Sequence, residues 1–385
     1  MNLIYLSPHY PAHYSQFVEC LAKYGVKVFG ISDLPDEALD PRLRDAMSGH
    51  YKVENLENVD QVLQGCGFFN EHIGKIDRVE SHLEPWIELE AVLRETYNIP
   101  GPKPAELQFI KRKSKMKDLF RRAQVPAARG ELVNNIEQCK KFIAGNYPVF
   151  IKPDIGVGAA DTYTIRSEDD LRNFFNGKQS YDYFMEDFVD GGLISFDGLT
   201  DQNGNIVFYT SHIFSNDIHK VVVKDENVWY YNVKDIPPEL EKYGRQIVKT
   251  AGVKEKFFHI EFFRKPDQSI LALEINMRPP GGLTTHMFNF SSDVDVYDWW
   301  ASIMAGKNPQ RNFTRKYHCA YVGRKHNRPY HYSHDQLYVK WNHKIVHSQP
   351  MNPIEYAVMG HWGYLARSTD LKELMEIVKD ITWEA

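Results

Sequence analysis

The chain has 385 residues, of which 25% are charged and 43% are hydrophobic, and its formal net charge is −5. These values are ordinary for a soluble protein of two or three domains, and the charge gives no reason to expect nucleic acid or an anionic membrane as a partner. The four cysteines and sixteen histidines lack paired or metal-ligand spacing, so we expect no disulfide framework and no zinc site. We interpret the histidines as surface or ordinary polar positions. No apolar run has the length of a signal peptide core or a membrane span, which predicts a cytoplasmic protein.

The first hundred residues alternate strand and helix signals. A strand, a helix and a second strand in sequence form a βαβ unit, which implies a parallel sheet. The first connection, residues 7–11, contains no glycine, so a dinucleotide-binding fingerprint is absent there. A cluster of proline and glycine at residues 99–104 predicts a domain boundary. The expected elements are strands at 2–6, 26–31 and 77–81 and helices at 14–24 and 85–97.

Beyond that boundary the pattern changes to hairpins mixed with helices. Asn203 and Gly204 form a clear hairpin-turn dipeptide between two apolar runs. The residues after 310 combine short strands with a terminal helix at 371–381, which predicts a small α/β appendage. The other expected elements are helices at 107–123, 136–145 and 237–251 and strands at 127–133, 148–152, 163–166, 184–189, 193–200 and 206–212.

Two alternating stretches, residues 258–264 and 270–278, predict a hairpin around a polar turn at 265–269. If the turn is centred on residues 267 and 268, alternate residues of each strand point to one side. The expected pairs are Ile260 with Ile275, Phe262 with Leu273 and Glu261 with Glu274. The polar face then carries Glu261, Glu274, Asn276 and Arg278.

Opposed glutamates on that face indicate a bound cation. Directly opposed side chains lie roughly 4.5–5.5 Å apart at Cβ, and like charges at that distance destabilise a sheet. Two carboxylates and an amide oxygen suit Mg²⁺, which completes its coordination with phosphate oxygens and water. Arg278 could hold an oxyanion through two hydrogen bonds. The alternative is an exposed hairpin face with solvated charges.

Basic and glycine-containing segments precede the hairpin. Lys152 ends an apolar strand, and the small-residue loop that follows it lets backbone N–H groups approach phosphate closely at Gly156 and Gly158. Lys113 lies in a basic helix, for which a solvated face is the alternative interpretation. Further along the chain, Glu186 and the backbone at Phe188 and Val189 could read an adenine edge, and Asp190 could hold ribose hydroxyls. The neighbouring lysines of the basic helix are Lys111, Lys115 and Lys117.

The order of these features resembles the ATP-grasp superfamily over about residues 104–307. The resemblance implies that Lys113 and Lys152 bind ATP phosphates, that residues 156–160 form the mobile glycine loop, and that residues 186–189 form the adenine-binding hinge. It implies cofactor-binding roles for Lys113, Lys152, Gly156, Gly158, Ala159, Glu186, Phe188, Val189 and Asp190. It implies metal-ligand roles for Glu261, Glu274 and Asn276, and catalytic roles for Arg278 and Lys152.

The implied fold class is α/β and α+β. A parallel-sheet domain at 1–103, similar to the one that precedes ATP-grasp domains, is followed by a small lobe at 104–185 and a large lobe at 186–310. The appendage at 311–385 completes the chain. The chain departs from the family at one position. The hinge of the family continues with a glutamate that binds ribose, and this position is Gly192 here. We therefore expect Asp190 to contact the ribose.

The resemblance implies an ADP-forming carboxylate–amine ligase, similar to L-amino acid ligases, that uses ATP and Mg²⁺ or Mn²⁺, with two ions expected. We expect small-molecule substrates, no nucleic acid, no membrane, and a homodimer as one assembly. Alternatives are a carboxylate–thiol ligase, a carbamoyl-phosphate-synthase-like or carboxylase-like enzyme, and a nucleotide-binding regulator without catalysis. The acyl pocket is expected around 196–200, 212–220 and 284–290. Asp197, His212 and His219 are open candidates for a general base.

Overall fold

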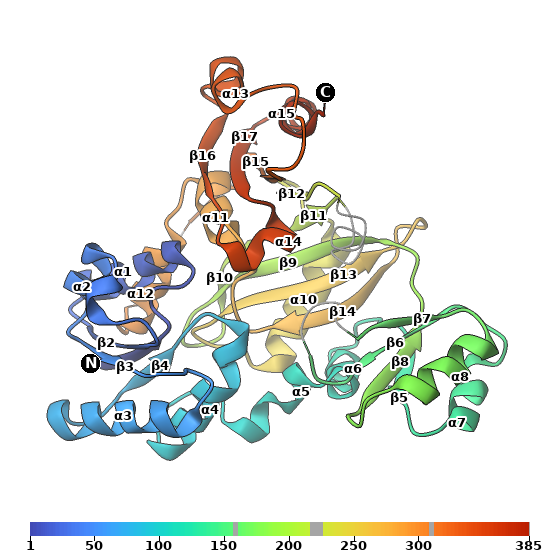
Figure 1. Ribbon diagram of the computed structural model, residues 1–385, viewed down its shortest axis with the longest axis horizontal. Helices are drawn as coiled ribbons and strands as arrows, with labels where there is room; N and C mark the ends of the chain where they lie inside the picture. Colours follow the sequence, from blue (N-terminus) through green and yellow to red (C-terminus); the bar gives the residue numbers. More distant parts are fainter. Residues whose placement is uncertain (157–160, 216–225, 308–311, 385) are drawn as a thin grey trace.

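The N-terminal domain is built on a four-stranded parallel sheet with the order β3-β2-β1-β4. The computed structural model describes residues 1–156, 161–215, 226–307 and 312–384 (Figure 1). The predicted βαβ unit is confirmed, because β1 and β2 pair in parallel on either side of α1. The elements are β1 (Asn2–Leu6), α1 (Ser15–Lys23), β2 (Lys27–Ser32), α2 (Pro41–Ala46), β3 (Gly49–Lys52), α3 (Val59–Ile73), β4 (Arg78–Glu80) and α4 (Ile87–Thr96), with short 3₁₀ turns at Ala12–Tyr14, Asp36–Ala38 and Glu84–Trp86.

A small lobe follows, with a four-stranded antiparallel sheet of order β5-β8-β6-β7. The predicted continuous helix over 107–123 is wrong at Arg112. This residue has extended backbone angles (φ −97°, ψ 121°) and forms a bridge with Ile155, so the helix divides into two. The elements are the 3₁₀ turn Pro104–Leu107, α5 (Gln108–Lys111), α6 (Lys113–Arg122), β5 (Gly130–Leu132), α7 (Ile136–Ile143), β6 (Val149–Pro153), β7 (Tyr163–Ile165), α8 (Glu168–Gly177) and β8 (Tyr183–Asp187).

The large lobe is organised by a nine-stranded sheet with the order β14-β13-β9-β11-β12-β15-β17-β16, in which β10 also pairs with β9. The strand expected over 206–212 is two strands, because residues on either side of Ser211 pair with different parts of the sheet. The elements are β9 (Gly192–Thr200), β10 (Ile206–Thr210), β11 (His212–Phe214), β12 (Trp229–Asn232), α10 (Pro238–Ala251), β13 (Phe257–Arg264), β14 (Ile270–Asn276), α11 (Thr284–Ser292) and α12 (Val296–Met304).

The hairpin of β13 and β14 has the predicted register over half of its length. Ile260 lies opposite Ile275 and Glu261 lies opposite Glu274, as expected. The predicted pairing of Phe262 with Leu273 is wrong. A bulge between Glu261 and Phe262 shifts the register, so Phe262 lies opposite Ala272. The bulge comes after the glutamate pair and leaves that pair in place.

The C-terminal residues continue the large sheet, since β15 pairs with β12 along an antiparallel ladder. The expected appendage at 311–385 is therefore an extension of the large lobe, which rises above the other lobes in Figure 1. Similarly, β8 of the small lobe extends to Asp187, past the expected boundary at 185. The remaining elements are β15 (His318–Arg324), α13 (His334–Trp341), β16 (Ile345–Pro350), a 3₁₀ turn at Pro353–Glu355, α14 (Tyr356–Met359), β17 (Trp362–Ser368) and α15 (Leu371–Thr382).

A buried charge cluster joins the N-terminal domain to the large lobe. Lys256, just before β13, donates hydrogen bonds to Glu80 and, at 2.9 Å, to Glu90 of the N-terminal domain. Arg94 donates to the same two carboxylates at 3.3 and 2.6 Å. All four side chains are buried, and α1 of the N-terminal domain also packs against α12 of the large lobe (Figure 1). This contact fixes the N-terminal domain next to the hairpin.

All four cysteines are buried free thiols, as the absence of paired spacing predicted. Within the described ranges, no helix combines the length and the apolar character needed to cross a bilayer.

Candidate active site

The first lysine of the site is placed by a buried aspartate. Asp154, directly after β6, is fully buried and accepts hydrogen bonds from the backbone N–H and the hydroxyl of Ser114 at 2.8 and 3.0 Å. The backbone N–H of Lys113 donates to the Asp154 carbonyl at 2.9 Å, and Lys113 Nζ donates to the Gly156 carbonyl at 2.9 Å. The start of α6 is therefore held against the loop after β6. Gly156 has φ of 154°, a conformation that favours glycine.

The second lysine lies in a buried cluster of three charges. Lys152 Nζ lies 2.5 Å from Glu186 Oε1, and Lys117 Nζ lies 2.9 Å from Glu186 Oε2. Burial alone raises the pKa of Glu186, but the two ammonium groups outweigh it and hold the pKa at about 2. Glu186 is thus a charged partner of two lysines, and its expected role in reading an adenine edge stays a prediction. Lys117 lies in this cluster and not on a solvated helix face.

Across the site, Glu261 and Glu274 face each other on the hairpin. Burial and the charge of Glu261 raise the pKa of Glu274, while Lys113 and Lys152 oppose that rise. Asn276 is 5% exposed and lies opposite His259, so it shares the face of the two glutamates. The structure therefore brings together the three metal-ligand candidates predicted from the sequence.

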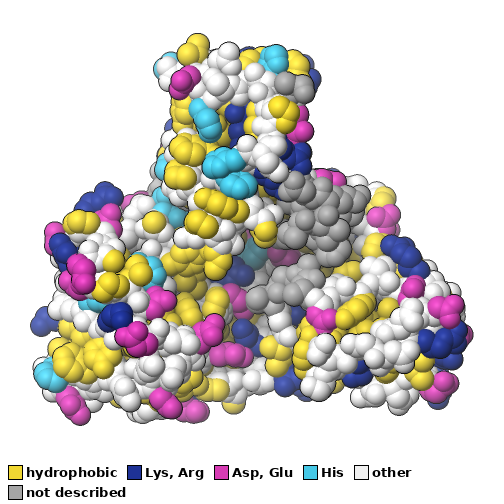
Figure 2. Space-filling model, in the orientation of Figure 1, with side chains coloured by type: hydrophobic (Ala, Val, Ile, Leu, Met, Phe, Trp, Pro, Cys, Tyr) yellow, Lys and Arg dark blue, Asp and Glu magenta, His cyan; other side chains and the backbone are white. Residues whose placement is uncertain are grey.

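The lysines and the hairpin belong to one electrostatic unit. Burial alone lowers the pKa of Lys152, yet the pKa is raised, first by Glu186 and then by both hairpin glutamates. Burial lowers the pKa of Lys113, and Glu274 counteracts this effect. In Figure 2, acidic and basic side chains lie close together in the hollow where the three lobes meet. The small lobe thus contributes the two lysines, and the large lobe contributes the two hairpin glutamates.

A buried network supports Glu261 from behind. His259 Nε2 lies 3.1 Å from Glu261 Oε1, and its Nδ1 lies 2.5 Å from Asp197 Oδ1. The other oxygen of Asp197 lies 2.7 Å from His212 Nδ1, and Ser195 Oγ donates to it as well. Burial lowers the pKa of His259, but Asp197 outweighs it and raises the pKa to about 9. His259 is therefore a cation between two carboxylates at neutral pH. One indication of this role was present in the sequence: His259 is two residues before Glu261, so both side chains lie on the same face of the strand.

Arg278 has a partner that we did not predict. Its Nε donates to Glu84 Oε2 at 2.9 Å, and one of its terminal nitrogens donates to the Pro279 carbonyl at 2.9 Å. Lys111 Nζ also lies 3.3 Å from Glu84 Oε1. Glu84 belongs to the N-terminal domain, so sequence spacing could not connect it with a residue 194 positions away.

Comparisons with known proteins agree with this geometry. Residues 145–287 match the model of the ATP-grasp domain, and this segment includes Lys152, Glu186 and the whole hairpin. This segment of the chain is an ATP-grasp domain. A curated L-arginine-specific L-amino acid ligase of Bacillus subtilis is 21% identical over 249 residues, which cover 62% of this chain and 60% of that protein. The matched part of the chain thus spans less than two thirds of this relative.

Two further proteins are similar to this chain. A carbamoyl-phosphate synthase of Methanobrevibacter smithii is 22% identical over 286 residues, which cover 71% of each chain. The crystal structure of an L-amino acid ligase from Bacillus licheniformis superposes with a TM-score of 0.74 and 14% identity, and covers 99% of this chain and 96% of the other. The superposition shows a common fold that includes the N-terminal domain and the C-terminal strands.

The segment expected to form the adenine-binding hinge joins β8 of the small lobe to β9 of the large lobe. Phe188 and Asp190 are exposed there and Val189 is half-buried. Space is open next to Gly192. These positions are accessible from solvent, and their roles in nucleotide binding stay predictions. The predicted loop residues Gly158 and Ala159, and the candidate base His219, lie outside the described residues.

The donors of the hairpin suit a hard cation. Within the described ranges, no three or more His, Cys, Asp or Glu side chains are grouped so that they could hold a metal ion by themselves. The hairpin offers two carboxylates and one amide, which is typical of Mg²⁺ sites that take their remaining ligands from phosphate and water. The raised pKa of Glu274 also fits, because a nearby cation would relieve the repulsion from Glu261.

Proposed function

We propose that this chain is an ATP-dependent, ADP-forming ligase that activates a small-molecule carboxylate as an acyl phosphate for attack by an amine. The observation that carries the proposal is the meeting of Lys113 and Lys152 with the carboxylate face of the hairpin. A site with two lysines on one side and opposed glutamates on the other suits a magnesium–nucleotide complex, since each charge gains a counter-charge when the complex is bound.

The proposed reaction has two chemical steps, and each step forms one bond and breaks another. A carboxylate oxygen of the substrate attacks the γ-phosphorus, and the bond from that phosphorus to ADP breaks. The amine nitrogen then attacks the acyl carbon, phosphate leaves, and the nitrogen loses a proton. Phosphoryl transfer depends on positioning and charge neutralisation, which Lys113 and Lys152 supply on the ATP side. Mg²⁺ at Glu261, Glu274 and Asn276 would neutralise phosphate charge when bound.

Arg278 is proposed to orient the carboxylate and the transferring phosphoryl group. Its planar guanidinium has five N–H donors, and the contacts with Glu84 and Pro279 hold it at the end of β14. Glu84 thus acts as a positioning residue. The adenine ring is proposed to lie against the hinge at residues 186–189, with Asp190 near the ribose.

The test is hydroxylamine trapping of acyl phosphates. The protein is incubated with ATP, Mg²⁺, hydroxylamine and a panel of carboxylates, and hydroxamate and ADP are measured together. We expect equal amounts of both for the correct acid, and a loss of more than about 100-fold in Glu274→Gln, as for removal of a transition-state charge partner. An activity that Glu274→Gln leaves intact would contradict the assignment of the site.

A second candidate function, carbamoyl-phosphate synthesis, is favoured by the match with the Methanobrevibacter protein over 71% of both chains. It requires bicarbonate as the acid, ammonia as the amine, and a second ATP that phosphorylates the resulting carbamate. The panel therefore includes bicarbonate with ammonia, without hydroxylamine, and carbamoyl phosphate is measured directly. Carbamoyl phosphate formation, without reaction of any organic acid, would decide for this second function.

A further inference from the structure

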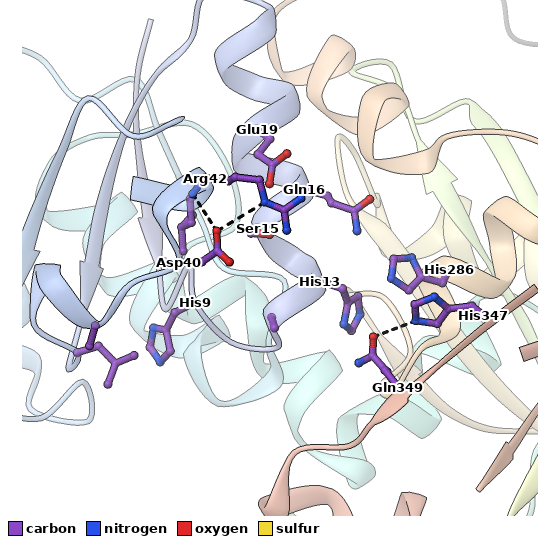
Figure 3. Close-up of a pocket in the computed structure, with 14 residues that line it drawn as sticks. His9, His13, Ser15, Gln16, Glu19, Asp40, Arg42, His286, His347 and Gln349 are labelled. Atoms are coloured by element: carbon purple, nitrogen blue, oxygen red, sulfur yellow. Dashed lines mark hydrogen bonds and ion pairs between the residues drawn. The ribbon is translucent and has the colours of Figure 1, made fainter. Parts of the chain in front are cut away.

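A second hollow lies where the N-terminal domain, α11 and β16 meet, away from the hairpin carboxylates (Figure 3). We call it the three-histidine pocket, after His13, His286 and His347, which line it together with Glu19, Asp40 and Gln349. Its volume is about 510 Å³, within the range of small-molecule sites. On the N-terminal side it is formed by the connections after β1 and β2, and the carboxyl ends of parallel strands are the usual ligand-binding edge of such sheets.

The three histidines form a continuous polar wall. The ring centroid of His286 lies 4.9 Å from that of His13 and 5.1 Å from that of His347. Burial lowers the pKa of His13, and it lowers the pKa of His286 to about 4, so both rings are neutral at pH 7. A neutral imidazole offers one donor and one acceptor.

One of these rings has an unused polar atom. His13 is 8% exposed, and its Nε2 is buried without a hydrogen-bond partner in the protein. An unpaired buried polar atom costs free energy, which a ligand that completes the hydrogen bond would recover. His347 differs, since its Nε2 is paired with Gln349 Oε1 at 2.9 Å. Nε2 of His13 is therefore the atom of this wall that is open to a hydrogen bond from a ligand.

The charge of the pocket is acidic. Among its 14 lining residues, Glu19 and Asp40 carry negative charges, and Arg42 carries the single positive charge. The Arg42 side chain is 81% exposed and already lies 3.7 Å from Asp40, so it adds little attraction for an anion. The neutral rings of His13 and His286 and a net formal charge of −1 favour a cationic ligand over an anionic one.

The pocket is adjacent to the proposed chemistry. His286 lies in the first turn of α11, which begins at Thr284 directly after the loop that carries Arg278 and Gly282. Thr284 Oγ1 donates to the Gly281 carbonyl at 2.7 Å, which fixes this helix end to the loop. On the other side, the ring of Tyr14 lies against that of His13, and Arg278 is close enough to oppose the rise that burial causes in the pKa of Tyr14.

We propose that the three-histidine pocket binds the amine substrate and selects small amines that carry a second positive charge. The proposal rests on the ligase function above. The distal ammonium group lies near Glu19 and Asp40, polar atoms of the ligand bond to His13, and the reacting nitrogen points towards the loop of Arg278. It also gives residues 311–385 a role, because β16 supplies His347 and Gln349.

Competition between nucleophiles tests this proposal. Hydroxylamine is too small to reach the acidic end of the pocket, whereas 1,4-diaminobutane and L-lysine have a second ammonium group. With the acid found by hydroxamate trapping, we expect both basic amines to be coupled more efficiently than L-glutamate. Glu19→Gln should raise the KM for 1,4-diaminobutane about tenfold more than it changes the hydroxylamine reaction, the loss expected for one charge-assisted hydrogen bond.

Control variants distinguish a loss of amine binding in the pocket from a loss of ligase activity in general. Glu37→Gln changes an exposed carboxylate in the connection after β2 that does not line the pocket, and it should leave every KM unchanged. His13→Asn provides a second variant in case Glu19→Gln fails to fold, and it should also raise the KM for the diamine, because it removes the ring proposed to bond to the ligand. If no acid gives hydroxamate, the ligase function fails and this proposal fails with it. If hydroxamate forms, but L-glutamate is coupled equally well or Glu19→Gln leaves the KM for the diamine unchanged, the pocket proposal alone is overturned.

Discussion

Lys117 on α6 and Glu186 on β8 form an ion pair of 2.9 Å, although 68 residues of other structure separate them along the chain. Lys117 is 8% exposed and Glu186 is 5% exposed. Lys152 holds the other oxygen of the same carboxylate. The pair therefore fixes α6, and Lys113 at its start, against the sheet of the small lobe.

Lys117→Met should destabilise the protein by about 3–5 kcal/mol, since removing one partner leaves a buried carboxylate with incomplete compensation. Urea unfolding gives this value. Lys115→Met is a matched control, because Lys115 lies on the same helix and is exposed; it should change stability by less than about 0.5 kcal/mol. Equal effects of the two substitutions would show that the ion pair contributes nothing specific.

Glu274→Gln should raise thermal stability in the absence of ligand and reduce the stabilisation that ligand provides. Without Mg²⁺ the substitution removes a repulsive charge opposite Glu261, so the thermal midpoint should rise. With Mg²⁺ and ATP the wild type should gain stability by mass action, and the variant should gain much less. Thermal unfolding with and without ligand measures both effects, and Glu88→Gln, at an exposed position, is the control. A drop in the metal-free midpoint would contradict the repulsion.

The pair of Asp197 and His259 should make the free energy of unfolding depend on pH in both the acidic and the alkaline range. The pKa of Asp197 is lowered from 3.8 to about 2, so its contribution is present above pH 3.8 and is lost as the pH falls towards 2. The pKa of His259 is raised from 6.5 to about 9, so its contribution is present below pH 6.5 and is lost as the pH rises through 9. Unfolding free energies between pH 6 and pH 10 should fall in the wild type and stay flatter in His259→Asn.

Lys256→Met should loosen the N-terminal domain. The substitution leaves Glu80 and Glu90 facing each other with Arg94 as their remaining cation, at a cost of about 3–5 kcal/mol. Hydrogen exchange should become faster in β1 and α4 before it changes in β13. Lys254→Met removes an exposed lysine from the same loop and should leave exchange unaltered. Uniform acceleration over the whole chain would mean that the cluster supports global folding and not this interface.

The hairpin could be predicted from local pattern, because an alternating pattern with a polar turn leaves few registers that bury the apolar face. Glu261 and Glu274 were therefore paired correctly. The bulge after Glu261 could not be predicted, since it depends on how β13 fits between β14 and β9. The break at Arg112 was missed for a similar reason: residues 112 and 155 meet only in the folded chain.

Tertiary structure alone decided which charges are buried. Lys115 and Lys117 are equivalent in the sequence, but one faces solvent and the other faces Glu186, because a helix rotates about 100° per residue and the sheet lies on one side. The partners Glu84 of Arg278 and Asp197 of His259 come from distant segments. Local patterns thus specified the strands and the side chains that we propose to bind phosphate. The long-range ion pairs and the three-histidine pocket required the assembled lobes, since electrostatic energy depends on distance and burial that no local spacing records.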